Sequence, residues 1–387
     1  MPFEFATASR ILFGPGTVED GVTAASSMGR RLLVVTGGTG LRHGLHVPED
    51  SIMFAVAGEP TVDTVRRGGE LARERGCDVV VAIGGGSAID AGKAIAALLT
   101  NPGDPLDYLE VIGRGKSLER TPAPLIAIPT TAGTGSEVTR NAVLGSPENR
   151  VKASLRSERM LPRLAVIDPQ LAMGLPRSVT APTGLDALTQ LIEPYLSVRA
   201  NPMTDLFCVE GMRRARRALP RAWENGNDLE ARTDMGWAAL LSGLALANAG
   251  LGAVHGFAAP IGGMFPAPHG AVCAALLSHV MAVNVAALRA REAGAVSDQR
   301  SAISKTLERY EHVARLLTER PQATAEDGIR WVGELCRKLE IPPLRNYGVR
   351  DVDFPMLVEK AARASSMKGN PVPLKPGELR EIVARAL

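Results

Sequence analysis

The feature that most constrains this chain is a long segment without charged side chains. Between Asp234 and Arg289 there is no aspartate, glutamate, lysine or arginine, yet His255, His269 and His279 all lie there. A segment of this length without charge must be buried in protein or in lipid. Prolines and glycines interrupt its middle, which makes it a poor membrane span. We therefore expect a buried helical core that carries histidines.

The amino-acid composition favours a globular protein and argues against nucleic-acid or membrane binding. The 387 residues are 45% hydrophobic and 22% charged, which is typical of a soluble globular protein with one large or two medium domains. A formal net charge of +3 is too small to indicate nucleic acid or an anionic membrane as a partner. The first residues lack the pattern of a secretory signal. The four cysteines lack a C-x-x-C spacing, so we expect free thiols and a cytoplasmic location.

Short apolar runs and helical stretches alternate in the first half of the chain. The runs predict strands at 31–36, 51–56, 78–83, 124–128 and 164–168, and helices are expected at 61–75 and 88–98. Strands separated by helices imply a parallel sheet with crossover helices. Beyond about residue 175 only helical periodicity continues. We predict an α/β dinucleotide-binding domain over 1–175 and an all-helical metal- and substrate-binding domain over 176–387, with the ligand in the cleft between them.

Two small polar loops follow neighbouring apolar runs. Gly84-Gly85-Gly86-Ser87 precedes a helix, and its glycines would let a phosphate approach the backbone and the helix N-terminus. Ser87 could cap that helix. The loop 129–139 holds several hydroxyls and two glycines, which suits a diphosphate and a sugar. The alternative for the first loop is a simple tight turn, but two such loops favour a nucleotide.

Four polar side chains of the second half are candidates for a metal site. Asp186 and Gln190 are four residues apart on a helix expected over 183–195, so they project from one face. His255 and His269 each stand beside a glycine in the charge-free segment. One carboxylate and two imidazoles would suit Zn²⁺ or Fe²⁺ with a position left open for substrate. The alternative is that each histidine is a hydrogen-bonded core residue.

These passages give the chain a resemblance to a known family. It resembles the iron-containing (group III) alcohol dehydrogenases of the dehydroquinate-synthase-like superfamily, over almost its whole length. The most specific match is the loop 129–139. The other matching passages are Ile11–Gly14, 84–90 with Lys93, Lys152, Asp168-Pro169, 183–189 with Ile192-Glu193, His255-Gly256, Pro268–Gly270 and Asn370-Pro371.

The resemblance implies a homodimeric enzyme that transfers hydride between NAD or NADP and a small alcohol, aldehyde or oxo acid. It places the active site between the domains, with the metal as Lewis acid. Asp186, His255 and His269 would bind the metal, and with Lys152 they are the catalytic candidates. Carried over by position, the cofactor-binding residues would be Gly37, Gly38, Gly85, Gly86, Ser87, Asp90, Thr130, Thr131, Thr134, Lys152 and Leu171.

The chain departs from the family pattern at two positions of the metal cleft. Gln190 stands where the family has a histidine ligand, and an amide is a weaker ligand than imidazole. Ala259 stands where relatives often have a further active-site histidine, which removes a proton-transfer group. Either the remaining three residues keep a metal site or the metal is lost. We assign no ligand role to His279.

A third departure concerns the cofactor. The stretch 35–40 lacks the carboxylate that many relatives use to bind the adenosine ribose, and Arg42 is nearby, so NADP(H) is favoured over NAD(H). If the metal is lost, Lys152 and Lys368 could stabilise an oxyanion in a metal-independent reductase of an anionic substrate, similar to maleylacetate reductases. A lyase or synthase of the superfamily, similar to dehydroquinate synthase, is a further alternative.

Overall fold

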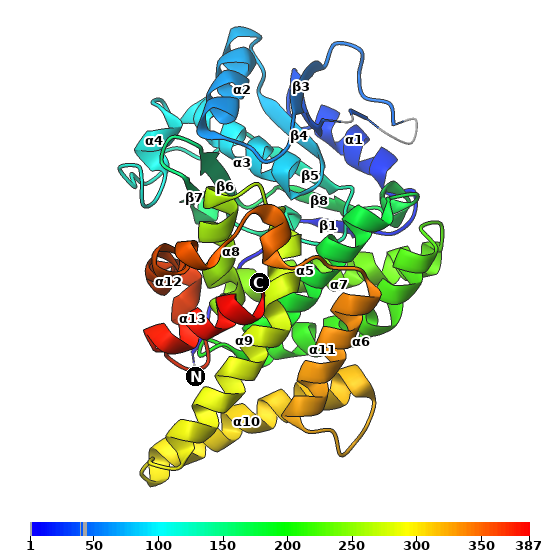
Figure 1. Cartoon of the computed structure of the whole chain (residues 1–387). Coiled ribbons are helices and arrows are strands. Elements are labelled where there is room, and N and C mark those ends of the chain that lie inside the picture. Colours follow the sequence, from blue (N-terminus) through cyan, green and yellow to red (C-terminus); the bar gives the residue numbers. More distant parts are fainter. Residues whose placement is uncertain (1, 39, 42–44) are drawn as a thin grey trace.

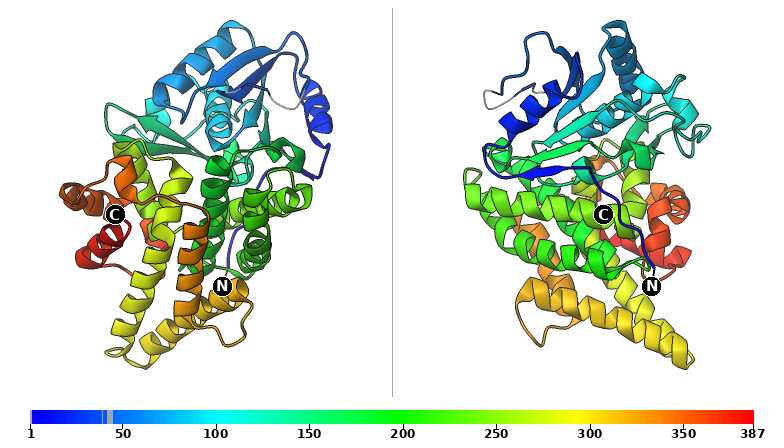
Figure 2. Two further views of the ribbon diagram at one scale, coloured as in Figure 1. Left: turned by 45° about the vertical axis from the view of Figure 1, so that its right-hand side comes forward. Right: turned by 180° about the vertical axis from the view of Figure 1, so that it is seen from behind.

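The computed structural model describes residues 2–38, 40–41 and 45–387. A sheet-containing part formed by the first half of the chain sits on a larger helical part (Figure 1). The two further views show the same division (Figure 2). The last strand ends at Ile167 and the first long helix of the second half begins at Arg177, on either side of the boundary expected near residue 175.

The sheet has six strands in the order β1-β8-β5-β4-β2-β3, and every neighbouring pair is parallel. The predicted parallel α/β fold is therefore confirmed. The strands are β1 (Ile11–Phe13), β2 (Leu32–Gly37), β3 (Ile52–Val56), β4 (Val79–Gly84), β5 (Leu125–Pro129) and β8 (Leu164–Ile167). Sequence reasoning missed β1 as a strand, because three residues are too few to show a period.

Helices cover both faces of the sheet because alternate strand residues point to opposite sides. On β4, Val80 and Ala82 pack in a core with α2 (Val62–Glu74) and α3 (Gly86–Thr100). Val79 and Val81 pack instead with α1 (Val18–Ser26). Burial on both faces explains why the central strands read as unbroken apolar runs. A short helix α4 (Pro105–Tyr108) follows α3.

An antiparallel hairpin lies beside the sheet and was not predicted from sequence. Its strands are β6 (Asn141–Ser146) and β7 (Val151–Arg156). Alternate residues such as Ala142 and Leu144 are buried, and they join the core that α3 covers. The period-two signal spans only six residues in each strand, and neither strand is strongly apolar. The hairpin places Lys152 against the helical part of the molecule.

The described residues beyond 176 form helices and short 3₁₀ turns. The helices are α5 (Arg177–Leu196), α6 (Pro202–Glu224), α7 (Leu229–Ala249), α8 (Ala253–Met264), α9 (His269–Glu292), α10 (Ser297–Thr318), α11 (Ala325–Lys338), α12 (Phe354–Arg363) and α13 (Pro376–Arg385). Their apolar faces form one continuous core with residues of β8 and with Val138 of the 129–139 loop. The helical fold expected for this half is confirmed.

The charge-free segment forms most of α7, all of α8 and most of α9. Helix α9 is long and apolar enough to cross a membrane, but 72% of its most apolar stretch is buried inside the protein. It runs through the helical part in contact with α5, α8 and α11 (Figure 1). Helices α7 and α8 meet at a bend of 99°. The segment is thus the histidine-bearing core that the sequence predicted.

The loop 129–139 joins the sheet to the helices by close backbone packing. Gly135 has a left-handed backbone (φ +59°), and a Cβ atom there would lie 2.5 Å from the Cα atom of Gly243 on α7. A Cβ atom on Gly133 would lie 2.9 Å from Cβ of Thr183 on α5. Thr183 stands three residues before Asp186. The polar loop therefore reaches the helix that carries the first metal-ligand candidate.

Candidate nucleotide and metal site

The two polar loops lie side by side at the carboxyl edge of the sheet. β4 and β5 are neighbours, with Gly84 opposite Pro129, and the N–H of Thr130 donates to the Gly84 carbonyl at 2.9 Å. A Cβ atom on Gly86 would lie 2.7 Å from Oγ1 of Thr134. Thr131 approaches the ideal Cβ position of Gly85 to 3.4 Å. Two glycines therefore let two threonines, Thr131 and Thr134, pack closely against one helix start.

Helix α3 begins at Gly86, two residues earlier than predicted, and this corrects the role given to Ser87. Gly85 is the residue before the helix, and no side chain caps it. Ser87 lies inside the first turn, so it does not cap the helix. The first intrahelical bond runs from the Ala88 N–H to the Gly85 carbonyl. The N–H groups of residues 86 and 87 precede that bond and lie at the helix N-terminus, the end of a helix that commonly binds anions in proteins.

Asp90 and Lys93 of α3 hold the second loop in place. Asp90 accepts hydrogen bonds from the Ser136 hydroxyl at 2.5 Å and from the Val143 N–H at 2.9 Å. Lys93 has a fully buried side chain and donates to Ser136, Thr139 and the Asn141 carbonyl at 2.8–2.9 Å. Burial lowers the pKa of Lys93. Both oxygens of Asp90 are thus engaged by the loop and the hairpin.

Glu137 lies in the same loop, and its buried carboxyl makes stability depend on pH. Burial raises its pKa from 4.5 to about 7. A raised carboxyl pKa means that the folded state binds more protons than the unfolded state between these pH values, so stability falls as pH rises through that window. We expect Glu137→Gln to remove up to roughly 3 kcal/mol of this pH dependence. Urea unfolding at pH 5 and pH 8 measures the change in unfolding free energy with pH. An equal change in the wild type and in Glu137→Gln would contradict the raised pKa of Glu137.

The remaining cofactor candidates lie at other strand ends. Gly37 ends β2 and Gly38 follows it, whereas Thr39 and Arg42 lie outside the described residues. Leu171 is buried in the 3₁₀ turn Pro169–Ala172, in the core beneath α1.

Lys152, at 7% side-chain exposure, forms an ion pair with Glu59 at 2.5 Å. The Lys152 ammonium lies directly against α8, because a Cβ atom on Gly262 of that helix would lie 2.3 Å from the Nζ atom of Lys152.

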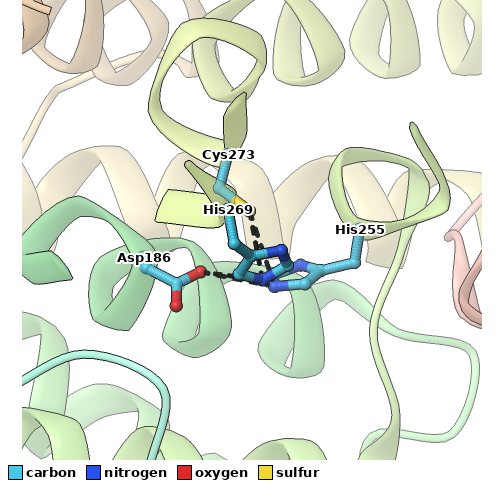
Figure 3. Close-up of side chains that lie close together, drawn as sticks. All are labelled: Asp186, His255, His269 and Cys273. Atoms are coloured by element: carbon cyan, nitrogen blue, oxygen red, sulfur yellow. Dashed lines mark hydrogen bonds and ion pairs between the residues drawn. The ribbon is translucent and has the colours of Figure 1, made fainter. Parts of the chain in front are cut away.

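The metal-ligand candidates converge from three helices. Asp186 on α5, His255 on α8, and His269 and Cys273 on α9 place one ligand atom each within 4.8 Å of all the others. Asp186 Oδ1 lies 3.5 Å from His255 Nε2 and 3.6 Å from His269 Nε2. The carboxylate and the thiol both point toward the two imidazoles (Figure 3). The structure therefore brings together the three residues predicted from sequence and adds a fourth.

The group fits a bound cation better than it fits an ion-pair network. Asp186 Oδ1 is buried and has no hydrogen-bond partner among the described residues. A buried carboxylate oxygen without a partner is costly, whereas a divalent ion would satisfy it. The donor set of carboxylate, imidazoles and thiol is one that Zn²⁺ and other transition metals bind.

Glu193 and Asn370 fix the position of His255. Glu193 lies 2.6 Å from Nδ1 of His255, and its other oxygen accepts the Val254 N–H at 2.7 Å. A carboxylate on Nδ1 leaves Nε2 free to face a metal, which is the arrangement usual for metal-bound histidines. Asn370 accepts the Ala253 N–H at 3.2 Å and so holds the start of α8.

The ionisable side chains of the cluster shift one another's pKa values. Burial lowers the pKa of both imidazoles, but neighbouring groups outweigh burial and both pKa values are raised. Cys273 acts on both histidines, Glu193 acts also on His255, and Asp186 acts also on His269. Burial raises the pKa of Asp186, but the two histidines outweigh it and the net pKa is lowered. Anionic neighbours therefore raise the pKa of both imidazoles, and a metal ion at the same point would compete with protons for them.

The two residues that depart from the family pattern lie one helical turn after metal-ligand candidates. Gln190 is buried one turn after Asp186 on α5, and its side-chain oxygen lies 3.3 Å from the Ser242 hydroxyl. Ala259 lies one turn after His255 on α8. His279 is half-buried further along α9, outside the ligand group. Lys368 is exposed in the 3₁₀ turn Ser365–Gly369.

Sequence reasoning missed two residues of the site. The cysteine spacing predicts only a free thiol at Cys273, although this residue stands four residues after His269 and so shares its helix face. The family resemblance includes Glu193 but implies no role for it. Its position, seven residues after Asp186, places both carboxylates on one side of α5. All four cysteines are free, as predicted.

A parallel sheet with two small polar loops at its carboxyl edge, joined to helices that carry a group of possible metal ligands, is typical of nucleotide-binding enzymes. Comparison with known proteins agrees. Residues 8–169 match the family "Iron-containing alcohol dehydrogenase", and residues 180–387 match "Fe-containing alcohol dehydrogenase family, C-terminal". The chain belongs to the iron-containing alcohol dehydrogenase family and is an oxidoreductase.

The similarity extends over whole chains. Alcohol dehydrogenase 4 of Schizosaccharomyces pombe is 37% identical, with 97% of this chain and 87% of the relative covered. The 1,3-propanediol dehydrogenase of Citrobacter freundii is 34% identical over 99% and 98% of the two chains. A crystal structure of a 1,3-propanediol oxidoreductase superposes with a TM-score of 0.87 at 32% identity and covers both chains completely. The family uses NAD(H) and a divalent metal.

Proposed function

We propose that this protein interconverts a small alcohol and its aldehyde or oxo acid, with a nicotinamide nucleotide as hydride carrier and a divalent metal held by Asp186, His255 and His269. The convergence of these three residues carries the proposal, together with the buried Asp186 Oδ1, which has no hydrogen-bond partner in the part of the chain that the structure describes. A metal ion there supplies Lewis-acid polarisation of the carbonyl. In the oxidative direction, the carbinol carbon gives hydride to the nicotinamide and the hydroxyl proton goes to solvent.

The chain's own residues account for cofactor binding. The backbone N–H groups at the start of α3 would hold the diphosphate, with Thr130, Thr131 and Thr134 as hydroxyl donors around it. Lys93 and Asp90 act as positioning residues, since they hold the loop that carries these threonines. Loop 129–139 packs against α5 one turn before Asp186, which would bring the nicotinamide end of the cofactor near the metal ligands.

Lys152 gives little support to the metal-independent alternative. Its ammonium is paired with Glu59 at 2.5 Å and is largely buried, so its charge is already compensated. An oxyanion or a substrate carboxylate would have to compete with that carboxylate. We therefore favour an uncharged aldehyde such as those formed from short primary alcohols and diols. The 1,3-propanediol dehydrogenases among the relatives are named for a substrate of this kind.

Turnover with a carbonyl panel tests the proposal. Protein purified without chelator is assayed with short-chain aldehydes and oxo acids, each with NADH and NADPH, before and after chelator treatment. We expect nucleotide oxidation with the short aldehydes, use of NADPH at least as efficient as that of NADH because 35–40 holds no carboxylate, and loss of activity on metal removal. Absence of turnover with every carbonyl would exclude a dehydrogenase, and full activity without metal would exclude the metal's role.

A further inference from the structure

Cys273 is positioned as a ligand although no sequence pattern assigns it that role. It stands on α9 one helical turn after His269, so the two side chains share one face. Its Sγ lies 3.7 Å from Nε2 of His255 and 3.7 Å from Nε2 of His269. The residue is fully buried, with its thiol directed at the same point as both imidazoles (Figure 3).

The spacing within the group is that of ligands around an ion. Zinc–nitrogen and zinc–oxygen bonds of about 2.0–2.1 Å and zinc–sulfur bonds of about 2.3 Å place tetrahedral N/O pairs about 3.4 Å apart and S/N pairs about 3.6 Å apart. The distances from Asp186 Oδ1 to the two imidazoles are 3.5 and 3.6 Å. Direct hydrogen bonds between charged partners would bring these atoms to about 2.7–2.9 Å. The carboxylate-to-imidazole contacts are longer than that, and the four ligand atoms are spaced as ligands around a common point would be.

A second observation points to the same centre. Asp186 is 1% exposed, and its Oδ1, the atom nearest the imidazoles, has no hydrogen-bond partner among the described residues. Glu193 holds Nδ1 of His255 from the other side and so turns Nε2 toward Cys273 and Asp186. A cation between the four side chains would satisfy this oxygen, which lacks a hydrogen-bond partner in the described part of the chain, and would use the oriented imidazole.

We propose that Cys273, as a thiolate, is the fourth protein ligand of the metal together with Asp186, His255 and His269. Gln190 on α5 is a weaker ligand than the histidine that the family has at this position. The sulfur of Cys273 on α9 supplies the fourth ligand in its place. The thiol proton leaves to solvent when the ion binds, so carboxylate and thiolate together balance a divalent charge. The ligand assignment rests on the metal of the proposed function.

A thiolate changes which metal the site selects. Thiolate is a soft ligand that favours zinc, whereas a site of carboxylate and imidazoles alone also suits Fe²⁺. We therefore expect this member of the iron-containing family to bind Zn²⁺ in preference to Fe²⁺, and we expect the preference to depend on one sulfur atom. Removing that sulfur should weaken zinc binding more than iron binding.

X-ray absorption of the zinc-loaded protein tests the ligand directly. We expect one sulfur at about 2.3 Å beside oxygen and nitrogen at about 2.0–2.1 Å. The Co²⁺-loaded protein should show a thiolate-to-cobalt charge-transfer band in the near ultraviolet. Cys273→Ala should lose the sulfur and the band, and its zinc affinity should fall at least about tenfold. Cys336→Ala is the matched control, because Cys336 is a cysteine of α11 that donates to the Ala274 carbonyl outside the ligand group.

The outcomes separate this proposal from the proposed function. Stoichiometric zinc with only oxygen and nitrogen around it overturns the role of Cys273 and leaves the metal enzyme intact. Absence of stoichiometric metal overturns both. If Cys273→Ala does not fold, the wild-type spectrum alone decides. The double variant Cys273→Ala/Gln190→His gives a further check, since it should regain zinc without regaining the cobalt band.

Discussion

Replacing Asp186 by asparagine is expected to abolish stoichiometric metal binding and to lower kcat/KM by about a thousandfold. The substitution keeps the shape of the side chain but removes the only carboxylate oxygen in the ligand group. Without that charge a divalent cation in the buried site would be left with two neutral imidazoles and the proposed thiolate of Cys273. Metal content by elemental analysis and steady-state kinetics with the best aldehyde measure the two effects.

Two measurements keep the Asp186 prediction specific. Glu210→Gln removes a carboxylate from α6, where Glu210 pairs with Arg214 at 2.7 Å away from the ligand group, and it should leave metal content and activity unchanged. Circular dichroism should show a folded Asp186→Asn protein. Retained metal and activity in that folded variant would remove Asp186 from the site.

Replacing Lys93 by methionine is expected to destabilise the protein by about 3–5 kcal/mol and to weaken nucleotide binding. Methionine keeps most of the volume but leaves Ser136, Thr139 and the Asn141 carbonyl without their buried donor. Asp90 also loses the nearby cation at 3.6 Å. Loop 129–139, which carries the threonines proposed to hold the diphosphate, would lose its anchor to α3. Urea unfolding and nucleotide titration by fluorescence measure the two losses.

Milder substitutions keep the Lys93 prediction testable if the methionine variant does not fold. Thr139→Val removes one of the three acceptors and should cost about 1 kcal/mol. Lys116→Met removes a lysine that is 54% exposed and pairs with Asp107 on the surface, and it should change neither stability nor nucleotide binding measurably. Equal stability of Lys93→Met and the wild type would show that the buried amine does not hold the loop.

Much of the sheet could be predicted because its signals are local. The central strands are buried on both faces and therefore appear as unbroken apolar runs, with turn residues at their ends. Parallel strands end at one edge, so the loops at 84–87 and 129–139 could be expected to meet there. β1 could not be predicted, because it is three residues long and pairs with β8, which is distant in sequence. The strands of the hairpin β6–β7 pair with each other, but their burial depends on packing against α3 and α8, which the local pattern does not show.

The kinds of ligand available, and the burial of the segment that carries both histidines, follow from the amino-acid sequence. Asp186, His255 and His269 stand out because a carboxylate and two imidazoles are unusual on helices that must face a core, and the absence of charge from 235 to 288 requires that core. Which side chains meet depends on how the helices pack. Cys273 faces the cluster and Glu193 orients His255 because α5, α8 and α9 pack at particular angles. Lys93 anchors loop 129–139 because α3 packs against that loop. Helical periodicity fixes which residues share a face, but the partner of that face depends on contacts between segments far apart in the chain.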